Sequence, residues 1–304
     1  MSKRREVQNR LSMLGEIDGI MVAMKNLALL EARKLETFLA TQRRAVSGIE
    51  TAAQDFLNFY PQASARTDGM QQLLLVIGSE RGFCGDFNET LLTPIALAAQ
   101  QEGTLLVAVG RRLGAKLQDD KRIAAFVEGP SVADEVPPAL MRLAKVLGEL
   151  QQRPEAAWRL SALYHDDESG EPRIRQLLPL ATPTGKSAHS HAPLLNLEPA
   201  RFLSQLTSQY FYAALHEIFY ASLMAENRKR LEHMENAIRR LEKDEAKLRL
   251  RYNALRQEEI IEEIEIIMLS AEALSGKENS DGSRHDAVLQ DDAKRSMPNL
   301  RLST

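Results

Sequence analysis

Residues 200–275 contain neither glycine nor proline, the two residues that most often interrupt a helix. Pro199 precedes this stretch and Gly276 follows it, so the sequence predicts one C-terminal helix over residues 200–275. At 1.5 Å per residue, such a helix would be roughly 110 Å long. Inside it, residues separated alternately by three and four positions form a heptad series, which is typical of a left-handed coiled coil. The series consists of Leu231, Met234, Ile238, Leu241, Glu245, Leu248, Tyr252, Leu255 and Glu259.

The first 60 residues predict the partner helix. They contain no proline, and their glycines are Gly15, Gly19 and Gly48. Apolar residues recur there every three or four positions, so we expect an N-terminal helix over residues 1–60, weakened near Gly15 and Gly19. An antiparallel coiled coil of the two terminal helices would bury both apolar series. The N-terminal series consists of Val7, Leu11, Leu14, Ile17, Met21, Met24 and Ala28.

The C-terminal helix is the longer of the two, so part of it is expected to extend beyond its partner. Apolar residues in that part cover more than one face of the helix, which indicates a surface that other protein covers. They are Ile260, Ile261, Ile264, Ile266, Ile267, Met268 and Leu269. Residues 276–304 are polar, charged and aperiodic, which predicts a disordered tail.

Residues 72–193 have a different pattern, with short apolar runs separated by turn residues. Strands are expected at residues 73–77, 105–109, 123–127, 158–164 and 174–180, and helices at 89–101 and 138–151. The acidic turn at residues 166–171 suits a hairpin. Strands that alternate with helices predict a small Rossmann-like α/β domain with a largely parallel sheet. The fold class is therefore mixed: a long antiparallel coiled coil plus an α/β domain.

Composition excludes several classes of protein. The formal net charge is −3, which does not indicate a nucleic-acid partner. Cys84 is the single cysteine, so neither an internal disulfide nor a cysteine-based zinc site is expected. No signal peptide or membrane-spanning run is apparent. Charge is uneven along the C-terminal helix: residues 228–256 hold ten basic and five acidic residues, whereas residues 258–265 hold five acidic ones. Two interpretations of the basic stretch remain open: it is a solvated helix face, or it is a basic collar that contacts an acidic loop of a partner.

No motif predicts catalysis, a cofactor or a metal. Residues 185–187 read Gly-Lys-Ser, but Leu180 stands where a phosphate-binding loop needs glycine. His189 and His191 lie in a polar loop without further ligands nearby. An α/β enzyme that dimerises through its own coiled coil would need a ligand pocket near residues 82–88. A scaffold or adaptor built from the same helices is the third alternative.

Three stretches resemble the gamma subunit of F-type ATP synthases, and the resemblance extends to about Leu274. Residues 20–25 (Ile-Met-Val-Ala-Met-Lys) are similar to the family's N-terminal motif. Residues 79–88 (Ser-Glu-Arg-Gly-Phe-Cys-Gly-Asp-Phe-Asn) are close to the family's Ser-Asp-Arg-Gly-Leu-Cys-Gly-Gly-Phe-Asn. Residues 252–257 (Tyr-Asn-Ala-Leu-Arg-Gln) are similar to its Tyr-Asn-x-x-Arg-Gln. Ile261 replaces a usual threonine, so the chain resembles a divergent bacterial form, of the proton-coupled or the alternative sodium-type branch.

The resemblance implies a non-catalytic rotor shaft that couples ion flow through a membrane ring to ATP synthesis or hydrolysis. The terminal helices would lie inside a hexamer of alpha and beta subunits, and the α/β domain would form a foot on the c-ring beside the epsilon subunit. The complex would lie peripherally on the cytoplasmic side of a bacterial inner membrane. The implied beta-subunit contacts are Arg256, Gln257, Met24 and Lys25, and the implied c-ring or epsilon contacts are Leu197, Glu198, Arg81 and Asn88.

Overall fold

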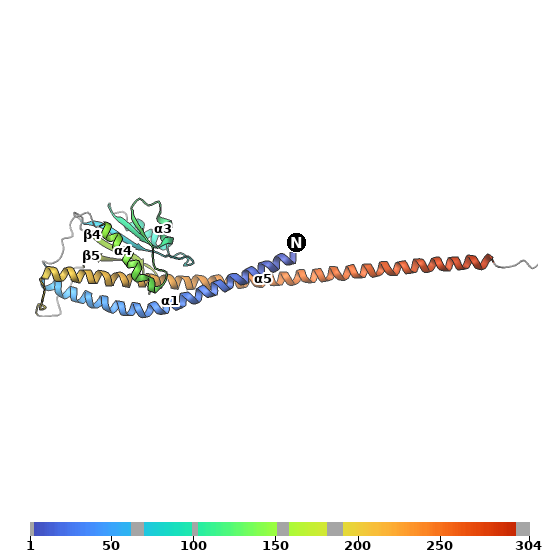
Figure 1. The fold of residues 1–304 in the computed structure, drawn as a ribbon, viewed down its shortest axis with the longest axis horizontal. Coiled ribbons are helices and arrows are strands. Elements are labelled where there is room, and N and C mark those ends of the chain that lie inside the picture. Colours follow the sequence, from blue (N-terminus) through green and yellow to red (C-terminus); the bar gives the residue numbers. More distant parts are fainter. Residues whose placement is uncertain (1–2, 62–69, 99–102, 151–157, 181–190, 296–304) are drawn as a thin grey trace, which may run out of the picture. The chain divides into compact units, whose positions relative to one another are not determined.

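The computed structural model describes residues 3–61, 70–98, 103–150, 158–180 and 191–295, with side chains described up to residue 272. Two long terminal helices enclose an α/β domain in the sequence (Figure 1). The elements are α1 (Lys3–Phe59), β1 (Gln71–Ile77), α2 (Glu89–Ala98), β2 (Leu105–Val109), α3 (Arg111–Leu117), β3 (Ile123–Val127), the 3-10 turn η2 (Ala133–Glu135), α4 (Val136–Leu150), β4 (Trp158–His165), β5 (Pro172–Leu178) and α5 (Pro199–Arg295).

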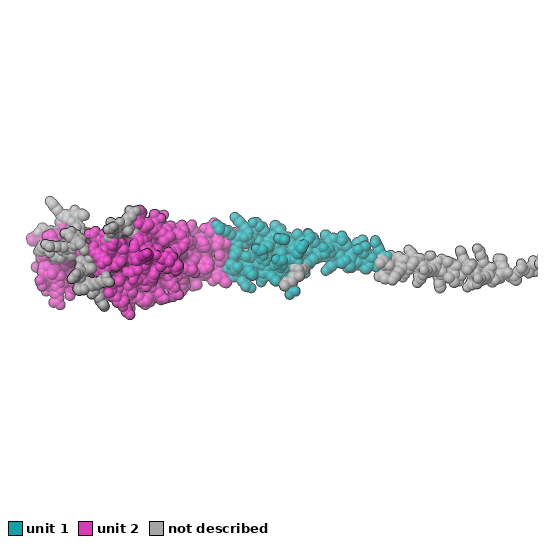
Figure 2. Space-filling view, turned by 90° about the horizontal axis from the view of Figure 1, so that it is seen from above, with its two compact units in different colours: residues 1–18, 240–304 teal, residues 19–239 magenta. Residues whose placement is uncertain are grey.

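The chain divides into two compact units, which Figure 2 shows in different colours. One comprises residues 19–239 and holds the α/β domain. The other comprises residues 1–18 and 240–304 and holds the beginning of α1 and the C-terminal part of α5. The mixed fold class predicted from the sequence, with long terminal helices and a central sheet, is confirmed.

The sheet of the α/β domain has the strand order β3-β2-β1-β4-β5. The first three pairings in that order are parallel, and the β4–β5 hairpin is antiparallel. The central strand β1 is buried along residues 73–77, because helices cover both faces of the sheet. All five expected strands are present. The short helix α3 was not predicted.

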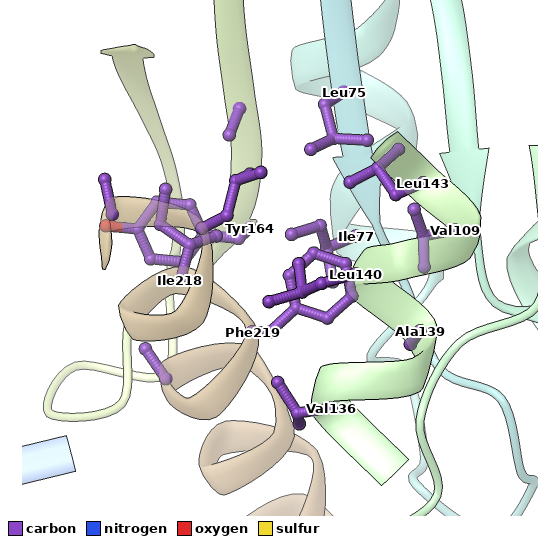
Figure 3. Close-up of a cluster of buried hydrophobic side chains, with 14 of the residues drawn as sticks. Leu75, Ile77, Val109, Val136, Ala139, Leu140, Leu143, Tyr164, Ile218 and Phe219 are labelled. Atoms are coloured by element: carbon purple, nitrogen blue, oxygen red, sulfur yellow. The ribbon is translucent and has the colours of Figure 1, made fainter. Parts of the chain in front are cut away.

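Apolar side chains from both terminal helices and the sheet share one core. Figure 3 shows Leu75, Ile77 and Val109 of the strands facing α4, with Ile218 and Phe219 of α5 beside them. A second core on the other face of the sheet contains Leu91 of α2 and Leu113 of α3, with other buried residues. The sheet is therefore held on one face by α4 and the terminal helices and on the other by α2 and α3.

Within residues 19–239, α1 and α5 run antiparallel. The rings of Phe38 and Tyr220 lie 5.7 Å apart, and Gln42 Nε2 donates a 2.9 Å hydrogen bond to the carbonyl oxygen of Ala213. Nearer the middle of the helices, Lys25 Nζ lies 2.9 Å from Glu235 Oε1. As the residue number rises on α1 it falls on α5, which confirms the expected direction of pairing.

In the other unit, Arg4 of α1 forms a 3.0 Å ion pair with Glu259 of α5, and Val7 is buried. The heptad positions of α5 in this unit are half-buried while most of their neighbours are exposed, which is the burial pattern of a coiled-coil seam. These positions are Leu241, Glu245, Leu248, Tyr252, Leu255 and Glu259.

The prediction for one residue of the N-terminal apolar series, Ile17, is wrong. Ile17 is 38% exposed, whereas Asp18 is half-buried with one carboxylate oxygen inaccessible to solvent. A strict heptad spacing from Val7 leads through Leu14 to Asp18, so the helical geometry selects the aspartate although the isoleucine is more apolar. α1 also continues through Gly15 and Gly19, whose missing side chains leave open space.

The C-terminal boundary differs from the prediction. α5 continues through Gly276 to Arg295, and residues 296–304 lie outside the described part of the chain. Each helical glycine costs only about 1 kcal/mol, and no proline lies between Gly276 and Arg295. From Ile260 to Glu272, every side chain is exposed in the isolated chain. In the described residues, no helix combines the length and the apolar character needed to cross a bilayer.

Candidate functional site

The loop between β1 and α2 carries the most specific sequence motif, and it is closed by its own side chains. Asn88 Oδ1 accepts a 3.0 Å hydrogen bond from the backbone N–H of Ser79, and Asn88 Nδ2 donates to Ser79 Oγ at 2.8 Å. Phe83 and Gly85 have positive φ angles of 65° and 61°, which turn the chain sharply. Residues 79–88 therefore form a compact loop at the carboxyl end of β1.

This loop packs on α5. Cys84 and Phe87 form a small buried cluster with Ala225. Lys229 Nζ lies 3.4 Å from Asp86 Oδ1, and Arg230 Nε donates a 3.4 Å hydrogen bond to the carbonyl oxygen of Gly82. The motif is thus a junction that fixes the α/β domain to α5. We call residues 79–88 together with residues 225–230 the loop junction.

A buried ion pair lies in the loop junction. Arg230 donates to the carboxylate of Glu226 one turn earlier and to Asn227 Oδ1 at 2.8 Å. The side chains of Glu226 and Arg230 are only 4% and 7% exposed. Burial raises the pKa of Glu226 to about 7, although the charge of Arg230 opposes that rise. The carboxyl group therefore titrates near neutral pH.

His165 at the end of β4 is the second buried titratable group at this end of the sheet. Its ring stacks on Phe87 at 3.8 Å, and its Nε2 lies 2.8 Å from Thr90 Oγ1. Burial, and to a lesser extent the charge of Lys229, lowers the pKa of His165 to about 4. The imidazole is therefore neutral at pH 7 and acts as a packing group.

The two groups have opposite effects on stability. The pKa of Glu226 is raised from 4.5 in the unfolded chain. Its contribution to the free energy of unfolding is therefore fully present below pH 4.5 and is lost as the pH rises through about 7. The pKa of His165 is lowered from 6.5, so its contribution is present above pH 6.5 and is lost as the pH falls through about 4. Their slopes oppose each other between pH 4.5 and 6.5.

We expect the Glu226→Gln substitution to remove the pH dependence of stability that Glu226 causes. The free energy of unfolding of the variant, relative to that of the wild-type chain, should increase by up to about 3 kcal/mol from pH 4.5 to pH 8, because glutamine stays neutral. Urea unfolding at a series of pH values measures this difference. Glu232→Gln, at an exposed position of α5, is the control and should give a constant difference. A constant difference for Glu226→Gln too would contradict the assigned titration.

The Cys84 thiol of the loop junction is not activated. Burial raises the pKa of the Cys84 thiol, which makes it a poor nucleophile at neutral pH. Its sulfur lies 3.4 Å from Ser79 Oγ, inside the loop. In the described residues, no group of three or more histidine, cysteine or acidic side chains could hold a metal ion. The Gly-Lys-Ser stretch and His189 lie outside the described residues.

The residues expected to contact a beta subunit lie on the terminal helices. Arg256 and Gln257 are exposed on α5, one turn before the fully exposed stretch. Met24 and Lys25 are half-buried on α1, and Lys25 pairs with Glu235. The structure thus leaves Arg256 and Gln257 open to a partner, whereas Met24 and Lys25 are partly engaged within the chain.

The residues expected to contact a c-ring or epsilon subunit are not all accessible. Arg81 and Glu198 are exposed, and Leu197 is half-buried just before α5. Asn88 is 5% exposed, and both ends of its amide are bonded to Ser79. Its geometry supports a role in shaping the loop.

Comparison with known proteins agrees with these features. A family model described as ATP synthase matches residues 3–274. The chain belongs to the ATP synthase family. Among its relatives, the gamma chain of Zymomonas mobilis is 26% identical over 301 residues, which cover 90% of this chain and all of the relative. The gamma chain of Symbiobacterium thermophilum is 28% identical over 71% of this chain and 77% of its own length. Within the family, these relatives are gamma chains.

Solved ATP synthase structures share the fold. A chain in the rotor of the Euglena gracilis mitochondrial ATP synthase has a TM-score of 0.57 and 15% sequence identity, with 84% of this chain and 98% of that chain covered. A chain in the central stalk and c-ring of the Tetrahymena thermophila enzyme has a TM-score of 0.53 and 16% identity, with 72% and 99% covered. Both likenesses support a fold in which an α/β domain lies between two long terminal helices in the sequence.

Proposed function

We propose that this chain is the central rotor shaft of a bacterial ATP synthase, in which it couples ion movement to ATP synthesis or hydrolysis without being catalytic itself. The observation that carries the proposal is the end of α5. From Ile260 to Leu269, apolar side chains are 44–67% exposed in the isolated chain, beyond the stretch that pairs with α1. Such an exposed apolar surface is typical of a site that other protein covers, and a hexamer of alpha and beta subunits would cover it.

The mechanism requires contacts that change as the shaft turns. Its two helices differ in length and charge, so each of several surrounding sites would meet a different face at any moment. A shaft can shift the conformation of a site only as far as its contacts differ between the conformations of that site. Arg256 and Gln257 are the proposed contacts with a beta subunit, and Met24 and Lys25 of α1 are proposed as further contacts.

The α/β domain is the proposed foot. Arg81, Leu197 and Glu198 are its proposed contacts with the c-ring or the epsilon subunit. The complex would lie peripherally on the cytoplasmic face of the inner membrane, and this chain would reach the membrane only through its partners. The coupling ion is a proton or a sodium ion, and ATP-driven pumping measured with and without sodium distinguishes the two.

The test is a double substitution, Arg256→Ala with Gln257→Ala, in the whole purified complex reconstituted into vesicles. We expect ATP-driven ion pumping to fall several-fold, while the isolated chain keeps its stability because both side chains are exposed. Arg33→Ala, at an exposed position of α1, is the control and should pump normally. Undiminished pumping by the double variant would contradict the assigned contact.

A further inference from the structure

The β4–β5 hairpin meets both terminal helices through arginine side chains. β5 is an edge strand of the sheet, and the hairpin turn at residues 166–171 lies beside α1 and α5. Three arginines from three different elements make the contacts: Arg43 of α1, Arg175 of β5 and Arg228 of α5.

Arg175 bonds to both helices at once. Its Nη2 donates to Glu50 Oε1 of α1 at 2.7 Å, and its Nη1 donates to Glu217 Oε2 of α5 at 2.9 Å. Its guanidinium also lies 5.9 Å from the ring centre of Tyr210 on α5. The side chains of Arg175 and Glu217 are only 18% and 17% exposed. One planar group therefore links the sheet edge to two helices.

The other two arginines hold the hairpin turn. Arg43 pairs with the carboxylate of Asp167, which is 6% exposed, and with Glu168 Oε1 at 3.3 Å. Arg228 donates to the carbonyl oxygen of Asp167 from the opposite helix. The turn is thereby attached to α1 and to α5. We call Arg43, Arg175 and Arg228, with the carboxylate and carbonyl groups that they bond to, the arginine clasp.

The arginine clasp differs in kind from the apolar core beside it. Apolar contacts are non-directional, so no single one of them fixes the angle between two groups. Charge-assisted hydrogen bonds to a planar guanidinium fix both distance and angle. The loop junction described above attaches the domain to α5, and the clasp adds links to α1 as well. A rotation of the domain about the helices would have to break the clasp.

We propose that the arginine clasp consists of positioning residues that prevent the α/β domain from slipping on the helices and so transmit torque between foot and shaft. This inference rests on the proposed rotor function. Arg175 is its central member, because it alone among the three bonds to carboxylates on both helices through a single side chain.

The test uses the whole complex in vesicles and compares ATP hydrolysis with the ion gradient that hydrolysis sustains. We expect Arg175→Met to lower the gradient at least twofold while ATPase activity and subunit content stay unchanged. Arg175→Lys should give an intermediate gradient, because an ammonium keeps the charge without the planar fork. Arg173→Met is the matched control: it is on the same strand, is 62% exposed and pairs with Asp166 of its own hairpin, so the gradient should be normal.

Two outcomes overturn the inference. One is a wild-type gradient in Arg175→Met, and the other is an equal loss in Arg173→Met. If Arg175→Met does not assemble, Glu50→Ala removes only the link to α1, and a wild-type gradient in that variant also contradicts the clasp. Failure of the wild-type complex to pump would instead contradict the proposed function, so the two ideas are tested separately.

Discussion

Replacement of Phe219 by alanine is expected to lower the free energy of unfolding of the isolated chain by about 3–5 kcal/mol. Phe219 is 1% exposed and lies in the core that α5 shares with α4 and the sheet (Figure 3). Its removal leaves a cavity where the domain meets the helix. Trp158 of β4, the single tryptophan, reports on the sheet when its fluorescence is followed during urea unfolding.

The matched control for this prediction is Tyr212→Ala. Tyr212 is another aromatic residue of α5, but it is 58% exposed. Its loss should change stability by less than about 1 kcal/mol. If both variants lose the same amount, the core assigned to Phe219 does not hold the domain to the helix.

The second large effect is expected at the other end of α5. Ile264 and Ile267 are 50% and 65% exposed in the isolated chain, so Ile264→Ser with Ile267→Ser should leave its stability nearly unchanged. Burial of an isoleucine in a partner contributes about 1.5–3 kcal/mol, so loss of two should weaken assembly with the alpha and beta subunits more than tenfold. The measurement is the yield of co-purified subunits.

Glu263→Ser is the control for the isoleucine pair. Glu263 is exposed next to Ile264, and its replacement by the same residue type tests whether position alone matters. It should assemble normally. Normal assembly of the double isoleucine variant would mean that this stretch of α5 is not enclosed by partner protein.

Features that depend on local periodicity could be predicted from the sequence. Between residues 231 and 259, the heptad series of α5 falls on buried or half-buried positions, because one helix face must be buried whatever the partner. Strands β2 and β3 begin and end where short apolar runs do. Asp18 shows the limit of this reasoning: apolarity favoured Ile17, but register places the aspartate in the seam.

The loop junction and the arginine clasp could not be predicted, because the residues that they bring together are far apart in the sequence. Glu226 and Arg230 have the spacing of an ordinary solvated pair on a helix. They are buried because the loop at residues 79–88, far earlier in the chain, packs over them. Arg175 likewise meets Glu50 from a strand 125 positions later. The end of α5 was misplaced because a single glycine is a weak stop signal.

The most direct test of the rotor assignment is co-purification of the whole complex from its host. The chain carries a tag, the membranes are extracted in mild detergent, and the proteins that accompany the tag are identified together with their ATPase activity. The account predicts recovery of alpha, beta, epsilon and c subunits together with ATPase activity. Recovery of the chain as a homodimer without these subunits would contradict the account and favour the enzyme or adaptor alternatives.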